Sequence, residues 1–452
     1  MPSRLLMIGL DGTDQVLMNS LVKAGRLPNI ERLLQHGNAR KVAFPIGASD
    51  DSQWAAFQYA CDLGHHGRYF WKRTAGFDGR FIFCDDEEEA LPAFWQSIGT
   101  HCGRVAIFDL PKCRPTPEIN GLHLTDWSVQ GRYGDRVRSW PTSLANEVIT
   151  QFGPEPDHYA ALHGHRLKPG KDQQFRNALL QSCDAKSAAA LHWLQSESWS
   201  LFATAFKEIH TASHALWPTS STHPLQADRD ADALQAIFAR VDRGLGQLIQ
   251  SAGKHAAVVL FSTSGFSESG SMDHFGDAIT QALNKKLQRE HAASENWFST
   301  LSLSIAGLFA RREFGNAPWL ARVPHIERTL AFRLRESSPR LLNQIRDDLT
   351  SLVDASTGQP VFVKVTMPRS EHTGPRAQNL PDVLAVVAIG VNPIRVHSPR
   401  LGGFEAAPAP VTAGYHSKHG FVISPPEYDR YLPASLVRMQ DLGPAAIRYL
   451  GA

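Results

Sequence analysis

The run Ser200-Leu-Phe-Ala-Thr-Ala-Phe206 is followed directly by Lys207-Glu-Ile-His-Thr-Ala-Ser-His-Ala-Leu-Trp217. The first run is mostly apolar and is typical of a buried β-strand. The second places His210 and His214 four residues apart, so in a helix both imidazoles point to the same side. Open α/β sheets bind ligands where their strands end, so these histidines predict a metal site at the carboxyl edge of such a sheet.

Apolar runs and helical segments alternate along much of the remaining chain. Buried or strand-like runs are predicted at 5–10, 104–110, 256–261, 360–366 and 382–389. Apolar residues at helical spacing predict helices at 27–37, 173–195 and 225–251. Strands separated by helices indicate parallel crossovers. The sequence therefore predicts an α/β fold with a doubly wound, mainly parallel sheet flanked by helices.

Two segments lack this alternation. Residues 111–170 are rich in Pro, Gly and Trp, and residues 275–355 combine helical with irregular sequence. We predict that both are loop-rich cap insertions. The catalytic core would then consist of residues 1–110, 171–274 and 356–452.

Composition restricts the class of partner. The 452 residues carry a formal net charge of +2, which argues against nucleic acid or an anionic membrane as the main partner. The apolar run Leu5–Leu10 is too short for a signal-peptide core or a membrane span. The five cysteines show no C-x-x-C spacing and are typical of reduced thiols. These features predict a cytoplasmic protein with a small-molecule substrate, and they leave its oligomeric state open.

Several short motifs occur in a fixed order. They are Gly9–Gly12, Gly25–Asn29, Trp54–Phe57, Gly64–Gly67, His210–Trp217, Phe261–Phe266, Pro381–Asp382 and His416–Gly420. Together they resemble the type I phosphodiesterase/nucleotide pyrophosphatase branch of the alkaline phosphatase superfamily. The resemblance implies an alkaline-phosphatase-like α/β fold with a bimetal, usually dizinc, site at the carboxyl edge of the sheet.

The resemblance assigns one metal to an Asp-x-x-x-His motif and a late histidine. The matching positions are His210, His214 and His416, so a histidine replaces the family's aspartate. Three imidazoles and one open position suit catalytic zinc, although manganese or iron would also be tolerated. Glu208, two residues before His210, is predicted to support these ligands through hydrogen bonds.

The second metal of the family is bound by an aspartate after the first strand, by the nucleophile and by an Asp-His pair. Asp11 matches the first of these ligands. Thr263 and Ser264 stand where the Asp-His pair belongs, and neutral hydroxyls are poor substitutes for it. We assign Thr263, Ser264 and Lys418 to substrate binding. The residues Asp273-His274 have the composition of the missing Asp-His pair, but they lie about ten residues after the position where the family has it.

Asp50 stands four residues before Trp54, where the family has its Thr or Ser nucleophile. It could act as a general base, as an additional metal ligand or as a carboxylate nucleophile, with Asp11 assisting. The cluster Ser49-Asp-Asp-Ser52 could instead cap the following helix.

These observations predict a metal-dependent hydrolase in which one zinc, held by three histidines, activates water against a phosphoester or related substrate. Two alternatives remain open. One is a zinc enzyme of the same fold with a changed reaction, such as a lyase, an acyl-group hydrolase or a transferase. The other is a non-catalytic binding protein on this scaffold.

Overall fold

The computed structural model describes residues 4–45, 47–74, 76–77, 80–84, 91–127, 137–154, 162–163, 166–168, 170–219, 231–299, 318–323, 328–407 and 412–452. The chain forms two compact units. Unit 1 consists of Met1–His66, Glu89–Ser269 and Val411–Ala452, and unit 2 consists of Gly67–Glu88 and Gly270–Pro410. The histidines and aspartates that we assigned to the site all belong to unit 1.

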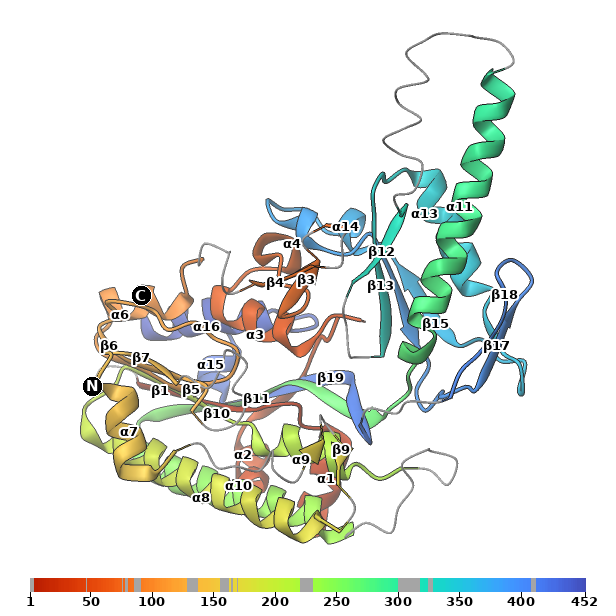
Figure 1. Ribbon diagram of the computed structural model, residues 1–452. Helices are drawn as coiled ribbons and strands as arrows, with labels where there is room; N and C mark the ends of the chain where they lie inside the picture. The colour runs from red at the N-terminus through yellow and green to blue at the C-terminus, as the bar shows by residue number, and fades with distance from the viewer. Residues whose placement is uncertain are drawn as a thin grey trace. The chain divides into compact units, whose positions relative to one another are not determined.

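A mainly parallel sheet forms the centre of unit 1 (Figure 1). Within the described ranges it has eight strands in the order β2-β19-β11-β1-β10-β5-β6-β7. The parallel strands are β11 (Ala256–Glu268), β1 (Arg4–Leu10), β10 (Leu201–Phe206), β5 (Val105–Leu110) and β6 (Gly121–Thr125). Antiparallel strands complete both sides, namely β19 (Gly414–Ser424), β2 (Asn38–Val42) and β7 (Arg138–Trp140). This architecture confirms the predicted α/β fold.

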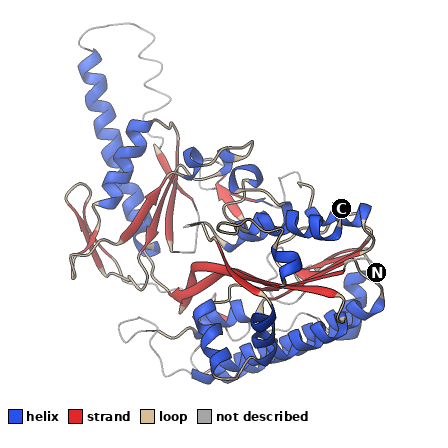
Figure 2. Ribbon diagram, turned by 180° about the vertical axis from the view of Figure 1, so that it is seen from behind, coloured by secondary structure: helices blue, strands red, loops and turns tan. Residues whose placement is uncertain are grey.

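Helices cover both faces of this sheet (Figures 1 and 2). Side chains of β1 therefore alternate between two cores, with Leu6, Ile8 and Leu10 in one and Leu5 and Met7 in the other. The first core contains residues of α1 (Gln15–Lys23), α2 (Pro28–His36), α7 (Leu144–Phe152), α8 (Asp172–Ser196), α9 (Glu208–Leu216) and α10 (Ala231–Ala252). The second contains residues of α3 (Asp50–Tyr59), α6 (Phe94–His101), α15 (Pro426–Asp429) and α16 (Met439–Leu450). Burial on both faces explains why the parallel strands are nearly continuous apolar runs.

Residues 111–170 differ from the predicted cap insertion. They supply β6 and β7, which extend the central sheet, and α7, which packs into the first core. Leu122 and Leu124 of β6 are buried in that core. The segment therefore belongs to unit 1, because strand pairing with β5 draws it into the sheet. Within the same segment, a short hairpin of β8 (Leu162–His163) and β9 (Arg166–Leu167) follows α7.

Unit 2 has its own sheet and core. Among its described residues, four strands occur in the order β12 (Leu320–Val323), β13 (Thr329–Leu334), β16 (Val383–Val387) and β15 (Phe362–Thr366). Residues of α11 (Gly276–Ser299) and α13 (Pro339–Thr350) share its hydrophobic core. Smaller sheets are formed by β14 (Val353–Asp354), β17 (Arg395–Ser398) and β18 (Gly402–Glu405), and by β3 (Lys72–Thr74) and β4 (Phe81–Phe83).

The boundary of unit 2 also differs from the prediction. Residues 356–410 belong to it rather than to the core that contains the first strand. The reason is strand pairing, since β15 pairs with β16 and β16 pairs with β13. The segment 275–355 is thus one part of a sheet-containing unit instead of a separate cap.

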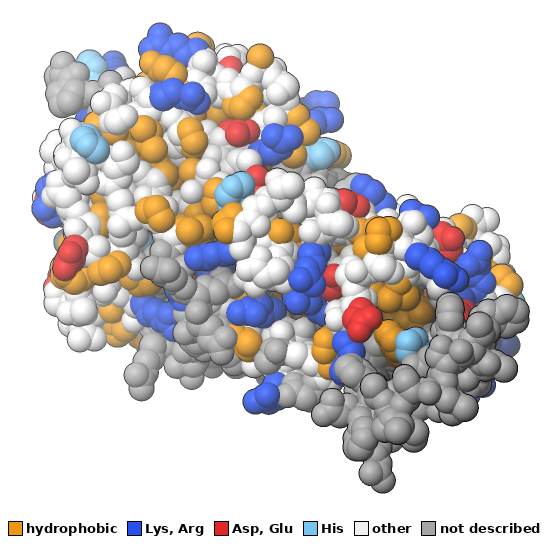
Figure 3. All heavy atoms as spheres, turned by 90° about the horizontal axis from the view of Figure 1, so that it is seen from above, with side chains coloured by type: hydrophobic (Ala, Val, Ile, Leu, Met, Phe, Trp, Pro, Cys, Tyr) orange, Lys and Arg blue, Asp and Glu red, His pale blue; other side chains and the backbone are white. Residues whose placement is uncertain are grey.

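The mixture of side chains on the surface agrees with the small net charge of the chain (Figure 3). In the face drawn in Figure 3, basic, acidic and apolar side chains are intermixed. Among the described helices, none is both long and apolar enough to cross a membrane.

Candidate metal centre

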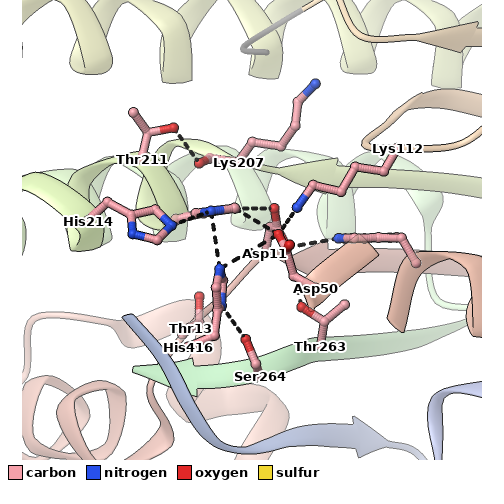
Figure 4. Close-up of polar contacts among 12 residues, drawn as sticks. Asp11, Thr13, Asp50, Lys112, Lys207, Thr211, His214, Thr263, Ser264 and His416 are labelled. Carbon is pink, nitrogen blue, oxygen red and sulfur yellow. Dashed lines mark hydrogen bonds and ion pairs between the residues drawn. The ribbon is translucent and has the colours of Figure 1, made fainter. Parts of the chain in front are cut away.

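Three histidines converge at the carboxyl edge of the central sheet. His210 and His214 lie on α9, which begins two residues after β10 ends, and His416 lies on β19. The Nε2 atoms of His210 and His214 are 2.8 Å apart, and Nε2 of His416 is 3.3 Å from that of His210 (Figure 4). Two nitrogens bound to one tetrahedral zinc lie about 3.3 Å apart. These three side chains could therefore hold a metal ion.

The Nδ1 atoms of His210 and His214 make hydrogen bonds that determine which ring nitrogen carries the proton. Nδ1 of His210 donates to Asp11 Oδ2 at 2.6 Å, and Nδ1 of His214 donates to the carbonyl oxygen of Gly414 at 2.9 Å. Carboxylate and carbonyl oxygens accept hydrogen bonds, so both Nδ1 atoms carry protons. In the neutral rings the two Nε2 lone pairs face each other across 2.8 Å. Lone pairs this close repel one another unless they share a proton or a metal ion, so the geometry is compatible with a bound metal ion.

Asp11, at the end of β1, orients His210. Its Oδ1 accepts hydrogen bonds from Trp54 Nε1 at 2.9 Å and from Thr263 Oγ1 at 3.3 Å, while its Oδ2 accepts from His210. Burial opposes ionisation, but the neighbouring His210 and Lys112 outweigh it and hold the pKa of Asp11 well below its ordinary value. Asp11 was predicted as a metal ligand, and it belongs to a group with Asp50 and His210 that could hold an ion, while in this structure both its oxygens accept hydrogen bonds from neighbouring side chains.

Thr263 and Ser264 take similar supporting positions. Both side chains are fully buried on β11. Thr263 donates to Asp11, and Ser264 Oγ lies 2.7 Å from Nδ1 of His416. Their role in substrate binding stays a prediction, and in the structure both side chains contact residues of the site. Ser264 can reach His416 because β11 and β19 are paired, with Ser264 opposite His419 and Phe266 opposite His416 across an irregular register.

Asp50, the first residue of α3, faces the imidazoles. Its Oδ2 lies 3.6 Å from His416 Nε2 and 3.7 Å from His210 Nδ1. The same oxygen forms an ion pair with Lys112. This arrangement favours a role in the site over a helix cap. Together with Asp11 and His210, Asp50 also forms a second set of side chains that could hold a metal ion.

Lys112 is a site residue that the sequence did not reveal. It lies two residues after β5, has a positive φ of 60° and is only 1% exposed. Its ammonium group is directed at Asp50 (Figure 4). A signal was present in the sequence, because a lysine just after a buried strand lies at the same sheet edge as Asp11 and His210.

Aromatic rings close one side of the centre. The ring centroid of Phe266 lies 4.5 Å from that of His416 and 5.0 Å from that of His214. Phe266 is fully buried and also contacts Trp217. An apolar wall beside the imidazoles excludes water from that side and strengthens electrostatic interactions within the site.

Other positions singled out in the sequence have the following surroundings. Glu208 accepts a hydrogen bond from Ser182 at 2.7 Å, and burial raises its pKa, while its support of the histidines stays a prediction. The backbone of Lys418 pairs with Gly265, but its side chain lies outside the described residues. Asp273 forms an ion pair with Arg322, and Nε2 of His274 hydrogen-bonds the carbonyl oxygen of Pro393; all of these residues belong to unit 2.

A buried ion-pair cluster lies at the base of the histidine helix. Lys186 Nζ is 2.6 Å from Asp109 Oδ2, Lys207 Nζ is 3.2 Å from Asp109 Oδ1, and all three side chains are fully buried. Burial lowers the pKa of Lys186 to about 8 although Asp109 opposes the shift, so Lys186 is mainly protonated at pH 7. A single carboxylate thus connects the end of β5 to α8 and to the residue that precedes α9.

Ser264→Ala tests the support of His416. We expect metal affinity to fall about 10- to 100-fold, because the replaced hydroxyl no longer orients the His416 ring. The affinity is measured by competition with a chromogenic chelator at pH 7. Ser267→Ala, on the same strand, is the matched control and should leave the affinity unchanged. Equal affinities for the two variants would contradict the supporting role of Ser264.

The central sheet and its flanking helices define an α/β fold of the alkaline phosphatase type. A sequence model of the family "Type I phosphodiesterase / nucleotide pyrophosphatase" matches residues 5–421. The chain belongs to this family, and it is an enzyme of the hydrolase class. No curated protein matches the chain significantly.

Solved structures share this fold. Phosphonoacetate hydrolase from Sinorhizobium meliloti 1021, in complex with phosphonoformate, has a TM-score of 0.60 and 14% identity, covering 99% of this chain and 96% of that chain. Its complex with phosphonoacetate gives a TM-score of 0.59 and 13% identity over the same shares. Murine ectonucleotide pyrophosphatase/phosphodiesterase 5 has a TM-score of 0.49 and 11% identity, covering 99% of this chain and 95% of that chain. At these identities the likeness to the two Sinorhizobium structures concerns the fold alone.

Proposed function

We propose that the protein is a metal-dependent hydrolase of a phosphoester or a related small anionic substrate, with one zinc ion held by His210, His214 and His416. The observation that carries this proposal is the 2.8 Å separation between the Nε2 atoms of His210 and His214. Three imidazoles with one open position are a ligand set of catalytic zinc. Family membership supports phosphoester hydrolysis. The small anions bound by the Sinorhizobium hydrolase support an anionic substrate.

The side chains around the histidines have separate tasks. A divalent ion bound there supplies Lewis-acid activation of water and of a phosphoryl oxygen. Asp50 faces the ring nitrogens and is placed to orient the attacking water and accept its proton. Asp11 holds the proton of His210 at Nδ1, which leaves Nε2 for the ion. Phe266 excludes water from one side.

Activity assays on chelator-stripped and zinc-reloaded protein test this proposal. The substrates are bis(p-nitrophenyl) phosphate, p-nitrophenyl phosphate and phosphonoacetate. We expect turnover of at least one of them by the reloaded protein only. Asp50→Asn should lower turnover about 10²- to 10⁴-fold with unchanged ion content, as expected for a general base. Loss of the ion in this variant would instead make Asp50 a ligand, and a loaded protein without turnover would contradict phosphoester hydrolysis.

A second candidate is a zinc enzyme of this fold with a changed reaction, such as a lyase, an acyl-group hydrolase or a transferase. One observation favours it, because the nucleophile position holds Asp50 in an ion pair with Lys112. The assay separates the two candidates. Zinc binding without hydrolysis of any of the three phosphorus compounds, combined with hydrolysis of a carboxylic ester or thioester, would identify the second.

A further inference from the structure

The positions that bind a second ion in the resembled family have other contacts in this chain. The two oxygens of Asp11 accept hydrogen bonds from His210, Trp54 and Thr263. Ser264 hydrogen-bonds His416. Thr263 and Ser264 carry hydroxyls in place of the Asp-His pair. The Thr263 hydroxyl donates to Asp11, and the Ser264 hydroxyl contacts the ligand His416. The donor set of a second ion therefore does not fit at Thr263 and Ser264.

A cation of another kind occupies this neighbourhood. The ammonium group of Lys112 pairs with Asp50 Oδ2, the oxygen that lies 3.6 Å from His416 Nε2. Lys112 is 1% exposed, and the turn after β5 fixes its backbone. The Asp50 carboxylate thus lies between the imidazole nitrogens and a fixed positive charge.

We infer that the ammonium group of Lys112 takes the place of the second metal ion, so that the centre pairs one divalent ion with one lysine. This inference builds on the proposed function only in assuming that the three histidines bind an ion. A second divalent ion bound by Asp50 would lie within a few ångströms of the ammonium group, and like charges at that distance in a buried site repel strongly. Lysine delivers one positive charge where the second ion would deliver two.

The competing arrangement is a second ion held by Asp11, Asp50 and His210. It requires His210 to bind two ions through its two ring nitrogens and to give up the proton that it donates to Asp11. It also requires Asp50 to exchange its ion pair with Lys112 for a metal bond. Both changes replace contacts that the structure already makes, which favours the lysine arrangement.

Ion stoichiometry provides the first test. The full-length protein is stripped, loaded with excess zinc, passed through a desalting column and analysed for zinc per chain without substrate. One ion per chain supports the inference, and two ions overturn it. No bound ion overturns both this inference and the proposed centre. One ion without phosphoester turnover leaves the inference supported and contradicts the proposed function, so the two failures are distinguishable.

Restoring the family's ligands provides the second test. Thr263→Asp combined with Ser264→His rebuilds the Asp-His pair while Lys112 remains, and we expect this double variant to bind one zinc. Adding Lys112→Ala removes the ammonium group, and the triple variant should bind two. Two ions in the double variant, or one ion in a folded triple variant, would overturn the inference. Circular dichroism establishes that each variant is folded.

A third test remains informative if those variants fail to fold. Lys112→Ala should lower the melting temperature of the zinc-loaded protein, and millimolar methylammonium should recover part of the loss by supplying the missing cation. Lys23→Ala, on the exposed surface of α1, is the matched control and should respond to methylammonium as the unmodified protein does. An unchanged melting temperature in Lys112→Ala, or a loss that methylammonium does not reduce, would overturn the inference.

Discussion

Replacing His416 by alanine is expected to weaken zinc binding about 10²- to 10³-fold. A structural zinc site with four ligands binds zinc with roughly 10–16 kcal/mol, so each ligand contributes about 3 kcal/mol. Turnover at limiting zinc should fall in parallel. The variant also separates the two parts of the centre, since His416 lies on β19 while His210 and His214 lie on α9. Zinc affinity is measured by competition with a chelator of known affinity.

His255→Ala is the control for this experiment, because His255 is exposed and precedes β11 in the same unit. We expect its zinc affinity to equal that of the unmodified protein. If His416→Ala retained full affinity, the late imidazole would not be a ligand. The site would then reduce to His210 and His214, which are too few to hold catalytic zinc.

The sequence predicted those parts of the site that depend on local structure. His210 and His214 follow from helical periodicity after an apolar strand, and both properties can be read within one short segment. The positions of Asp11 and Asp50 follow from motifs adjacent to one strand and one helix. His416 lies about 200 residues away, and only the order of motifs connected it to the pair.

The directions of the side chains could not be predicted from the sequence. Thr263 and Ser264 were identified as replacements, but their bonds to Asp11 and His416 depend on how β11 pairs with β1 and β19. Lys112 and Asp109 lie at or just after the end of β5 with positive φ values of 60° and 55°. Non-glycine residues rarely adopt this conformation, so the sequence gives little indication of such a turn.

The unit boundaries were missed for a related reason. The strand β6 has five residues and β7 has three, so neither produces a long apolar run. Their place in the sheet depends on pairing with β5, which is a tertiary contact. The segments that contain β15 and β16 were predicted as strands, but the sequence did not show that they pair within a separate unit.

Asp109→Ala is expected to lower the free energy of unfolding by about 3–5 kcal/mol, because it leaves Lys186 and Lys207 buried without their shared carboxylate. The loss is measured by urea denaturation of metal-free protein, so that ion binding does not add to stability.

Glu197→Ala is the matched control for Asp109→Ala. It removes an exposed ion pair with Arg104 that also connects the ends of α8 and β5, with side chains 42% and 45% exposed. Solvent screens such pairs, so its loss should cost less than about 1 kcal/mol. Because the Asp109 carboxylate also anchors the residue before α9, its removal should weaken zinc binding as well, whereas Glu197→Ala should not. Equal effects of the two substitutions on unfolding would mean that the buried cluster does not stabilise the base of the histidine helix.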